Sequence, residues 1–187
     1  MDALIVADRT KMQFAISDVL NRVKIDCTVC SNAAEARRAA LVRPFDIFII
    51  NGGLSDEQGN ELAAFLADSF DCGGIYIDDY VKVDMFSDDL GECGVVSLIR
   101  PITKSTLAET VRIVTVANAR VRALKEQNEK LNAKLDDLKY ISRAKIALMH
   151  SLGYSEEQAH KFIEKKSMDM RMSRRKVAMD ILKTYEA

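Results

Sequence analysis

The sequence predicts an α/β domain with a five-stranded parallel sheet, joined by a long coiled-coil helix to a small three-helix module. Three observations support this prediction. Short apolar runs alternate with helical patterns up to about residue 117, a seven-residue repeat follows, and the C-terminal segment is basic. With 187 residues, of which 48% are hydrophobic, the chain can bury one full core and a smaller second one.

The predicted elements alternate along the N-terminal part of the chain. Apolar runs predict strands at residues 3–7, 25–30, 45–50, 74–77 and 95–99. Helical spacing of apolar residues predicts helices at residues 11–23, 33–42 and 59–70, and a further helix from residue 104 onward. Strands that are apolar throughout are typical of a parallel sheet covered by helices on both faces.

Functional side chains in such a sheet belong at the carboxyl ends of the strands. At these positions residues 1–117 resemble the receiver domain of bacterial response regulators, which has a flavodoxin-like fold. The resemblance rests on the segments LIVAD, DIFIINGGLSDEQG and GECGVVSLIRPIT. It implies an acidic pair for Mg²⁺, a phosphoacceptor Asp, a Thr or Ser after the fourth strand, and a Lys before Pro.

Four of these positions depart from the family's pattern. Ala7 and Asp8 stand at the acidic pair, Asn51 at the phosphoacceptor, Asp78 near the hydroxyl position, and Arg100 at the Lys. An amide is a poor nucleophile and a weak ligand for a hard cation. The sequence therefore predicts a degenerate receiver with no metal or other cofactor. A regulatory protein or a ligand would then supply the input, unless the protein is constitutively competent.

Three other features of this part have simple interpretations. Asn51 precedes Gly52, a pair prone to deamidation, which would create an acid at this position. Cys27 and Cys30 form a C-x-x-C, but strand positions three apart face opposite ways, so buried reduced thiols are predicted rather than a zinc or redox site. A solvated acidic loop, rather than a metal site, is predicted for Asp78, Asp79, Asp84, Asp88 and Asp89.

A heptad repeat begins at Val114 and Ala117 and predicts a coiled-coil linker helix over residues 114–142. The predicted dimerisation residues are Val121, Leu124, Asn128, Leu131, Leu135 and Leu138. A buried Asn at such a position fixes the register and favours two parallel strands. The alternative is a single helix packed on its own domains.

Three short helices are predicted after Leu138. Gly153 can end the first with a positive φ, Ser155 and Gln158 form a capping box for the second, and Ser173 can cap the third. Interior packing is predicted for Met149, Met168, Met170 and Met172.

Residues 135–184 closely resemble the ANTAR domain, an antiterminator module of certain response regulators, so residues 135–187 are predicted to form such a domain. The resemblance rests on Ile141, Ala144, Lys145, Leu148, Met149, Gly153, Ser155, Ala159, Ser167, Met168, Arg171, Val177 and Ala178. Leu138 and Ile146 depart from the family, which often has Arg and Gly there. The resemblance implies binding to stem-loops in nascent mRNA, which prevents formation of a terminator hairpin.

The charge distribution agrees with a polyanion as partner. Residues 1–117 hold 11 Lys and Arg against 18 Asp and Glu, whereas residues 118–187 hold 16 against 10. The predicted RNA-binding residues are Arg143, Lys145, Lys165, Lys166, Ser167, Arg171, Arg174, Arg175 and Lys176. Arginine planes, and Tyr154 if exposed, can stack on unpaired loop bases. Ser167 either donates to a phosphate or satisfies a helix end.

The sequence therefore predicts a dimeric RNA-binding transcription antiterminator that is not an enzyme. It is expected to be cytoplasmic and without a membrane partner, since no run approaches the ~20 apolar residues of a membrane span. Two alternatives remain open: a DNA-binding response regulator of the helix-turn-helix type, and an adaptor that binds only proteins.

Overall fold

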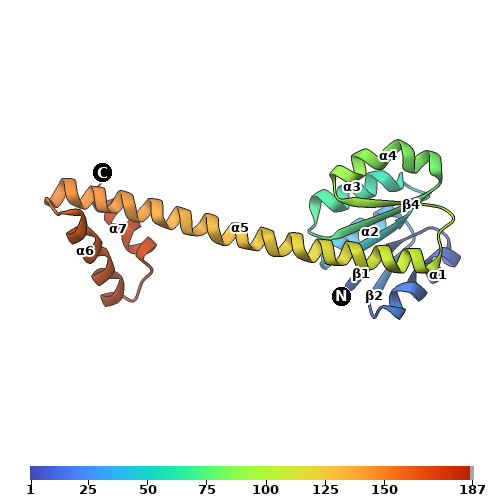
Figure 1. Ribbon diagram of the computed structural model, residues 1–187, viewed down its shortest axis with the longest axis horizontal. Coiled ribbons are helices and arrows are strands. Elements are labelled where there is room, and N and C mark those ends of the chain that lie inside the picture. Colours follow the sequence, from blue (N-terminus) through green and yellow to red (C-terminus); the bar gives the residue numbers. More distant parts are fainter. Residues whose placement is uncertain (186–187) are drawn as a thin grey trace. The chain divides into compact units, whose positions relative to one another are not determined.

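The computed structural model describes residues 1–185. The chain divides into two compact units, Met1–Ala123 and Leu124–Ala187 (Figure 1). Helix α5 (Lys104–Leu152) supplies the last helix of the first unit and the first helix of the second. No helix within the described residues combines the length and the apolar character that a membrane crossing requires.

The first unit contains the predicted five-stranded parallel sheet, with strand order β2-β1-β3-β4-β5. Its strands are β1 (Asp2–Val6), β2 (Asp26–Cys30), β3 (Ile47–Asn51), β4 (Gly73–Asp78) and β5 (Val95–Ile99). Its other helices are α1 (Thr10–Arg22), α2 (Ala33–Val42), α3 (Gly59–Ser69) and α4 (Tyr80–Glu92).

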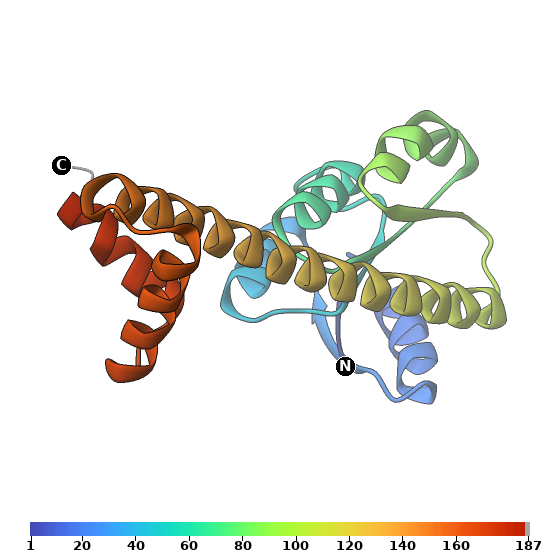
Figure 2. The same cartoon turned by 60° about the vertical axis from the view of Figure 1, so that its left-hand side comes forward.

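Alternation along the strands divides the core of this unit into two layers. Leu4 and Phe48 pack with α2, α3 and α4 on one face of the sheet. Ile5 and Ile49 pack with α1 and the start of α5 on the other face. Figures 1 and 2 show these two layers of helices around the sheet. Both faces are covered, which explains why the strands read as continuous apolar runs.

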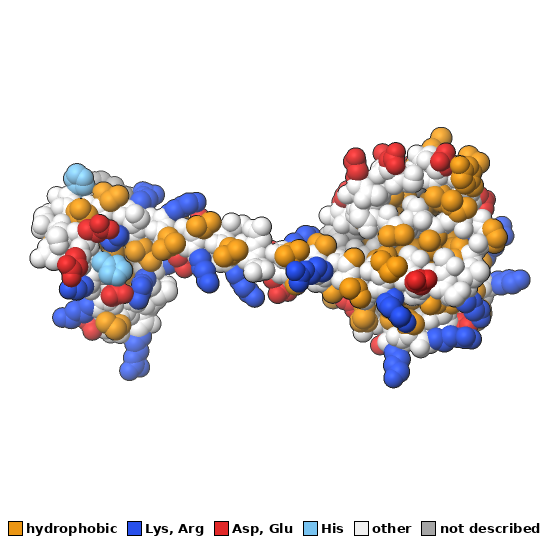
Figure 3. Space-filling model, viewed as in Figure 1, with side chains coloured by type: hydrophobic (Ala, Val, Ile, Leu, Met, Phe, Trp, Pro, Cys, Tyr) orange, Lys and Arg blue, Asp and Glu red, His pale blue; other side chains and the backbone are white. Residues whose placement is uncertain are grey.

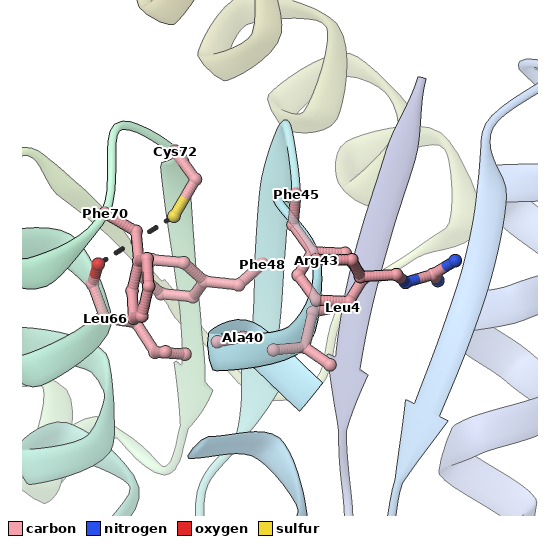
Figure 4. A pocket seen from close by; sticks show the side chains of 8 residues that line it. All are labelled: Leu4, Ala40, Arg43, Phe45, Phe48, Leu66, Phe70 and Cys72. Atoms are coloured by element: carbon pink, nitrogen blue, oxygen red, sulfur yellow. Dashed lines mark hydrogen bonds between the residues drawn. The ribbon is translucent and has the colours of Figure 1, made fainter. Parts of the chain in front are cut away.

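The cysteines are free thiols that pack within these layers. Cys30 belongs to the first layer and Cys27 packs against the second, so the prediction of opposite faces is confirmed. Cys72 lines a cavity of about 10 Å³ and its Sγ lies 3.8 Å from the carbonyl oxygen of Leu66 (Figure 4). Burial raises the pKa of Cys72 to about 11, so this thiol stays protonated at neutral pH.

The prediction of an acidic loop before β5 is wrong. The segment forms α4, because Val83, Phe86 and Leu90 follow helical spacing and pack on the sheet. Asp84 and Asp88 lie on its exposed side. In the sequence, the many acidic residues of this segment made the helical spacing of its three apolar residues easy to overlook.

Helix α5 is fixed to the amino-terminal edge of the sheet by Arg122. Its Nη1 donates to Asp46 Oδ1 at 2.8 Å, and its Nε donates to the carbonyl oxygen of Asp71 at 2.7 Å. Val114 is buried in the same unit, so the heptad prediction is wrong there: Val114 packs on the sheet and is not available to a partner helix.

The Asp46 carboxylate is expected to stabilise the first unit in a pH-dependent way. The backbone N–H of Asp2, followed by Arg122, holds the pKa of Asp46 below its ordinary value. This stabilisation is complete above the unfolded pKa of about 3.9 and is lost as the pH falls through the lower folded pKa. Asp46→Asn is therefore expected to lower the free energy of unfolding at pH 7 by about 1 kcal/mol, through weaker hydrogen bonding, and to lower Tm accordingly. Thermal unfolding of the wild type and of Asp46→Asn at pH 7 and below pH 4 tests this. A difference in Tm between the two proteins that does not shrink at low pH would contradict the prediction.

The second unit consists of the end of α5, α6 (Glu156–Asp169) and α7 (Arg174–Tyr185). Figure 2 shows α6 and α7 against the end of α5. Its small core is formed by Ala144, Ala147, Leu148, Ala159, Ile163, Val177, Ala178, Ile181 and Leu182.

Three predicted helix ends of this unit are confirmed. Gly153 follows α5 with φ of 65°. The capping box of Ser155 and Gln158 opens α6. Ser173 Oγ accepts the backbone N–H of Lys176 at 3.3 Å and caps α7.

The prediction of interior methionines is wrong for three of the four. Met172 packs against the small core, but Met149, Met168 and Met170 are exposed. The core of this unit is too small to cover them, because helices of 12 to 14 residues enclose little volume.

Candidate functional site

The carboxyl ends of the strands bring the predicted sheet-edge residues around one open cavity of about 420 Å³. Asp8 follows β1, Asn51 ends β3, Asp78 ends β4 and Arg100 follows β5. The parallel register of β3, β4 and β5 places these last three side chains at the same edge. Ala7 is buried and contributes no polar group.

Arg100 connects the side chains of this edge. Its Nη2 donates to Asp78 Oδ1 at 2.6 Å, and its Nη1 donates to Asn51 Oδ1 at 3.1 Å. Its Nε donates to Asp79 Oδ1 at 3.2 Å. One guanidinium thus holds two acids and one amide, and it does so with three different nitrogens of its fixed planar group, which the single nitrogen of Lys does not offer.

Asp78 is almost fully buried and is held from several sides. Tyr76 Oη donates to its Oδ2 at 2.7 Å, and the backbone N–H of Asp79 donates to its Oδ1 at 2.8 Å. Burial, and then the hydrogen bond to Asp78, raise the pKa of Tyr76 above its ordinary value. The carboxylate fits because residue 52 is Gly: a β-carbon there would lie 2.0 Å from Asp78 Oδ2. The feature of the sequence that could have indicated this buried carboxylate is an Asp directly after an apolar run.

These residues do not fit the Mg²⁺ that the receiver fold implies. Ala7 replaces one carboxylate of the acidic pair, and the oxygens of Asn51 and Asp78 accept from Arg100. A guanidinium already supplies the positive charge at this point. Within the described residues no group of three or more His, Cys, Asp or Glu is arranged to hold a metal ion.

The fold is expected to protect Asn51 from deamidation. The reaction requires the backbone nitrogen of Gly52 to attack the side-chain carbonyl of Asn51. That nitrogen donates to the carbonyl oxygen of Ile77 at 2.7 Å, and Asn51 is only 2% exposed. Native protein at pH 8 should therefore keep its Asn51 while a synthetic peptide of residues 46–58 deamidates. Peptide mapping by mass spectrometry checks this, and equal rates would show that the strand end opens readily.

Most of the predicted RNA-binding residues lie together around the turn from α6 to α7. They form the α6–α7 basic cluster, which consists of Lys165, Lys166, Arg171, Arg174, Arg175 and Lys176. Blue Lys and Arg side chains project from the helices of this unit in Figure 3.

Two members of this cluster make exposed ion pairs. Arg174 Nη2 lies 2.7 Å from Glu164 Oε1, and Arg175 Nη1 lies 3.2 Å from Asp137 Oδ1. Exposed ion pairs of this kind contribute little and can exchange for phosphate contacts.

The structure does not bring Lys145 into this cluster. Lys145 Nζ lies 2.6 Å from Glu156 Oε1, at the beginning of α6. The cluster begins near the other end of α6, a helix of 14 residues, which corresponds to a length of about 20 Å. The predicted residues therefore form two groups rather than one continuous surface.

Ser167 serves as a helix-end residue. Its Oγ donates to the carbonyl oxygen of Met172 at 2.6 Å, which ties the end of α6 to the following turn. Tyr154 is partly buried and packs edge-on against Phe162, with ring centroids 5.8 Å apart.

Comparison with known proteins agrees with this architecture. Residues 129–182 match the ANTAR domain family. The chain is 21% identical to the transcriptional regulatory protein PdtaR of Mycobacterium tuberculosis over 182 residues, 97% of this chain and 89% of that protein.

Solved structures match the first unit. The receiver domain of the Francisella response regulator 1452 has a TM-score of 0.56 and 19% identity, over 62% of this chain and 97% of that one. The chemotaxis response regulator CheY4 of Vibrio cholerae has a TM-score of 0.53 and 18% identity, over 60% of this chain and 97% of that one. Residues 129–182 therefore match the ANTAR domain, and they follow a domain with the receiver fold.

Proposed function

We propose that this protein is a non-enzymatic transcription antiterminator that binds stem-loops in nascent mRNA as a dimer and prevents terminator formation. The observation that carries the proposal is the α6–α7 basic cluster within the ANTAR domain. Six cations around one turn favour a phosphate backbone, because binding releases its condensed counterions. Arg143 and Lys145, which point to different sides of α5, would add further phosphate contacts.

The dimer is proposed to form along α5. Its heptad residues Val121, Leu124, Leu131, Leu135 and Leu138 are 47–62% exposed in the single chain. Asn128 Oδ1 accepts from Asn132 Nδ2 at 2.7 Å. Because Asn128 is the acceptor in this contact, its own amide N–H can donate to the Asn128 of a second copy, which supports a parallel register.

The receiver-fold domain is proposed to act without phosphorylation. Asn51 offers no carboxylate to a phosphodonor, and Arg100 is neutralised by Asp78 rather than by a phosphoryl group. Control by a regulatory protein or ligand, or constitutive competence, would then replace the phosphorylation switch.

The test is binding of purified full-length protein to RNA hairpins and to duplex DNA, across a salt series, with and without acetyl phosphate. We expect hairpin binding that weakens steeply with salt and does not respond to acetyl phosphate. Preference for duplex DNA would indicate the DNA-binding alternative. Binding to neither nucleic acid would indicate an adaptor and refute the proposal.

A further inference from the structure

Helix α6 is followed, after its C-cap, by a residue with an unusual backbone conformation. Arg171 has φ of 50°, in the left-handed region. Its N–H donates to the carbonyl oxygen of Met168 at 3.2 Å, and the N–H of Met172 donates to that of Ser167 at 3.0 Å. This pair of bonds is a Schellman motif, whose left-handed position is usually Gly because a β-carbon is strained there.

The same motif ends α1, where Lys24 has φ of 59°. Lys24 N–H donates to the carbonyl oxygen of Asn21 and Ile25 N–H to that of Leu20, both at 3.1 Å. The left-handed conformation alone therefore does not identify a binding residue. Lys24 is instead a matched control, with the same backbone strain in the other unit.

The surroundings of Arg171 differ from those of Lys24. Met168 and Met170 precede it in the chain and are 70% and 48% exposed. In the sequence these two exposed apolar residues lie between Lys166 and Arg171, two members of the α6–α7 basic cluster. Thioethers are polarisable and pack well against aromatic rings.

Hydrogen bonds also hold the backbone of the turn at this point. Ser167 Oγ donates to the carbonyl oxygen of Met172 at 2.6 Å, so the backbone on both sides of Arg171 is fixed. A side chain that starts from a fixed backbone loses less conformational entropy when it binds a ligand.

We propose that Arg171, together with Met168 and Met170, forms the contact site for one unpaired nucleobase of the RNA loop. The planar guanidinium stacks on the base and the two thioethers contact its edge, while the other cations of the cluster bind the flanking phosphates. RNA loops expose such bases, whereas duplexes bury them in the stack. This inference rests on the proposed RNA-binding function and assigns the base-contacting residues within it.

The first test compares stability with RNA affinity in full-length Arg171→Gly and Lys24→Gly. Gly removes the strain of the left-handed position, so both variants are expected to raise the Tm of the unit that carries them, by roughly 4 °C. The probe is the best-binding hairpin selected with the wild-type protein from a pool with a fixed stem and a randomised loop. Only Arg171→Gly is expected to raise Kd for this hairpin, by about tenfold or more. Equal Kd values for wild type and Arg171→Gly overturn the inference.

The second test separates base contact from charge. Arg171→Lys keeps the charge but loses the planar group, so we expect it to weaken binding nearly as much as Arg171→Gly. Hairpins with an abasic site at each loop position in turn should include one on which wild type and Arg171→Gly bind equally. Full affinity of Arg171→Lys, or an Arg171→Gly defect that persists on every abasic hairpin, would show a phosphate contact and overturn the proposal.

Failure of this inference can be told apart from failure of the proposed function. If selection with wild-type protein yields no hairpin, the RNA-binding function itself fails, and this inference fails with it. If wild type binds a selected hairpin and Arg171→Gly binds it equally well, the function stands and the inference alone fails.

Discussion

Replacing Leu131 and Leu135 with Lys is expected to abolish dimerisation and, with it, RNA binding. Both side chains are about half exposed on α5 and lie on the heptad stripe. In a dimer they would be buried at the seam, where two unpaired charges on each chain would cost several kcal/mol. Analytical ultracentrifugation of the full-length variant measures the first effect, and hairpin binding measures the second.

The matched control places the same two charges away from the stripe. Ala119 and Ala133 are exposed on α5 and fall at the outermost heptad position, so Ala119→Lys/Ala133→Lys should remain dimeric. A Leu131→Lys/Leu135→Lys variant that stays dimeric would refute dimerisation through the heptad stripe of α5. A monomeric variant that still binds the hairpin tightly would show that RNA binding does not need the dimer.

Gly52→Ala is expected to lower the free energy of unfolding by about 2–3 kcal/mol, as overpacking of a filled site does. The added β-carbon would lie 2.0 Å from Asp78 Oδ2, and Asp78 cannot retreat without loosening its bond to Arg100. Asp78→Ala is expected to cost about 3 kcal/mol, because Arg100 and Tyr76 lose a buried partner. Denaturant unfolding of the full chain measures both changes.

The double variant tests whether the two effects share one cause. Once Asp78 is Ala, only Tyr76 Oη remains close to a β-carbon at residue 52, at 2.9 Å, so Gly52→Ala should cost much less in that background than in the wild type. Gly53→Ala is the adjacent comparison, since Gly53 has φ of 83° and a β-carbon added there would meet nothing within 4 Å. Gly53→Ala lowers the free energy of unfolding through backbone strain, so its effect should persist in the Asp78→Ala background. Additive costs for Gly52→Ala and Asp78→Ala would show that the carboxylate does not occupy this space.

The sequence predicted the elements whose signals are local. The apolar runs of β1, β3 and β4 were recognised because buried parallel strands need no alternation. The capping box at Ser155 and the positive φ of Gly153 followed from residue chemistry within one turn of helix. Helix α4 was missed because the acidic residues on its exposed side outnumber the three apolar residues that pack on the sheet.

The chain's sequence by itself thus determined the receiver fold, the ANTAR domain and the presence of Asn51 at the end of β3. Only the tertiary structure decided that Asp78 is buried against Arg100, that Lys145 pairs at the far end of α6 from the basic cluster, and that Met168 stays exposed. The physical reason is the range of the interactions. Strand, helix and cap formation depend on residues within a few positions, whereas ion pairing and burial depend on which side chains the fold brings together from distant parts of the chain.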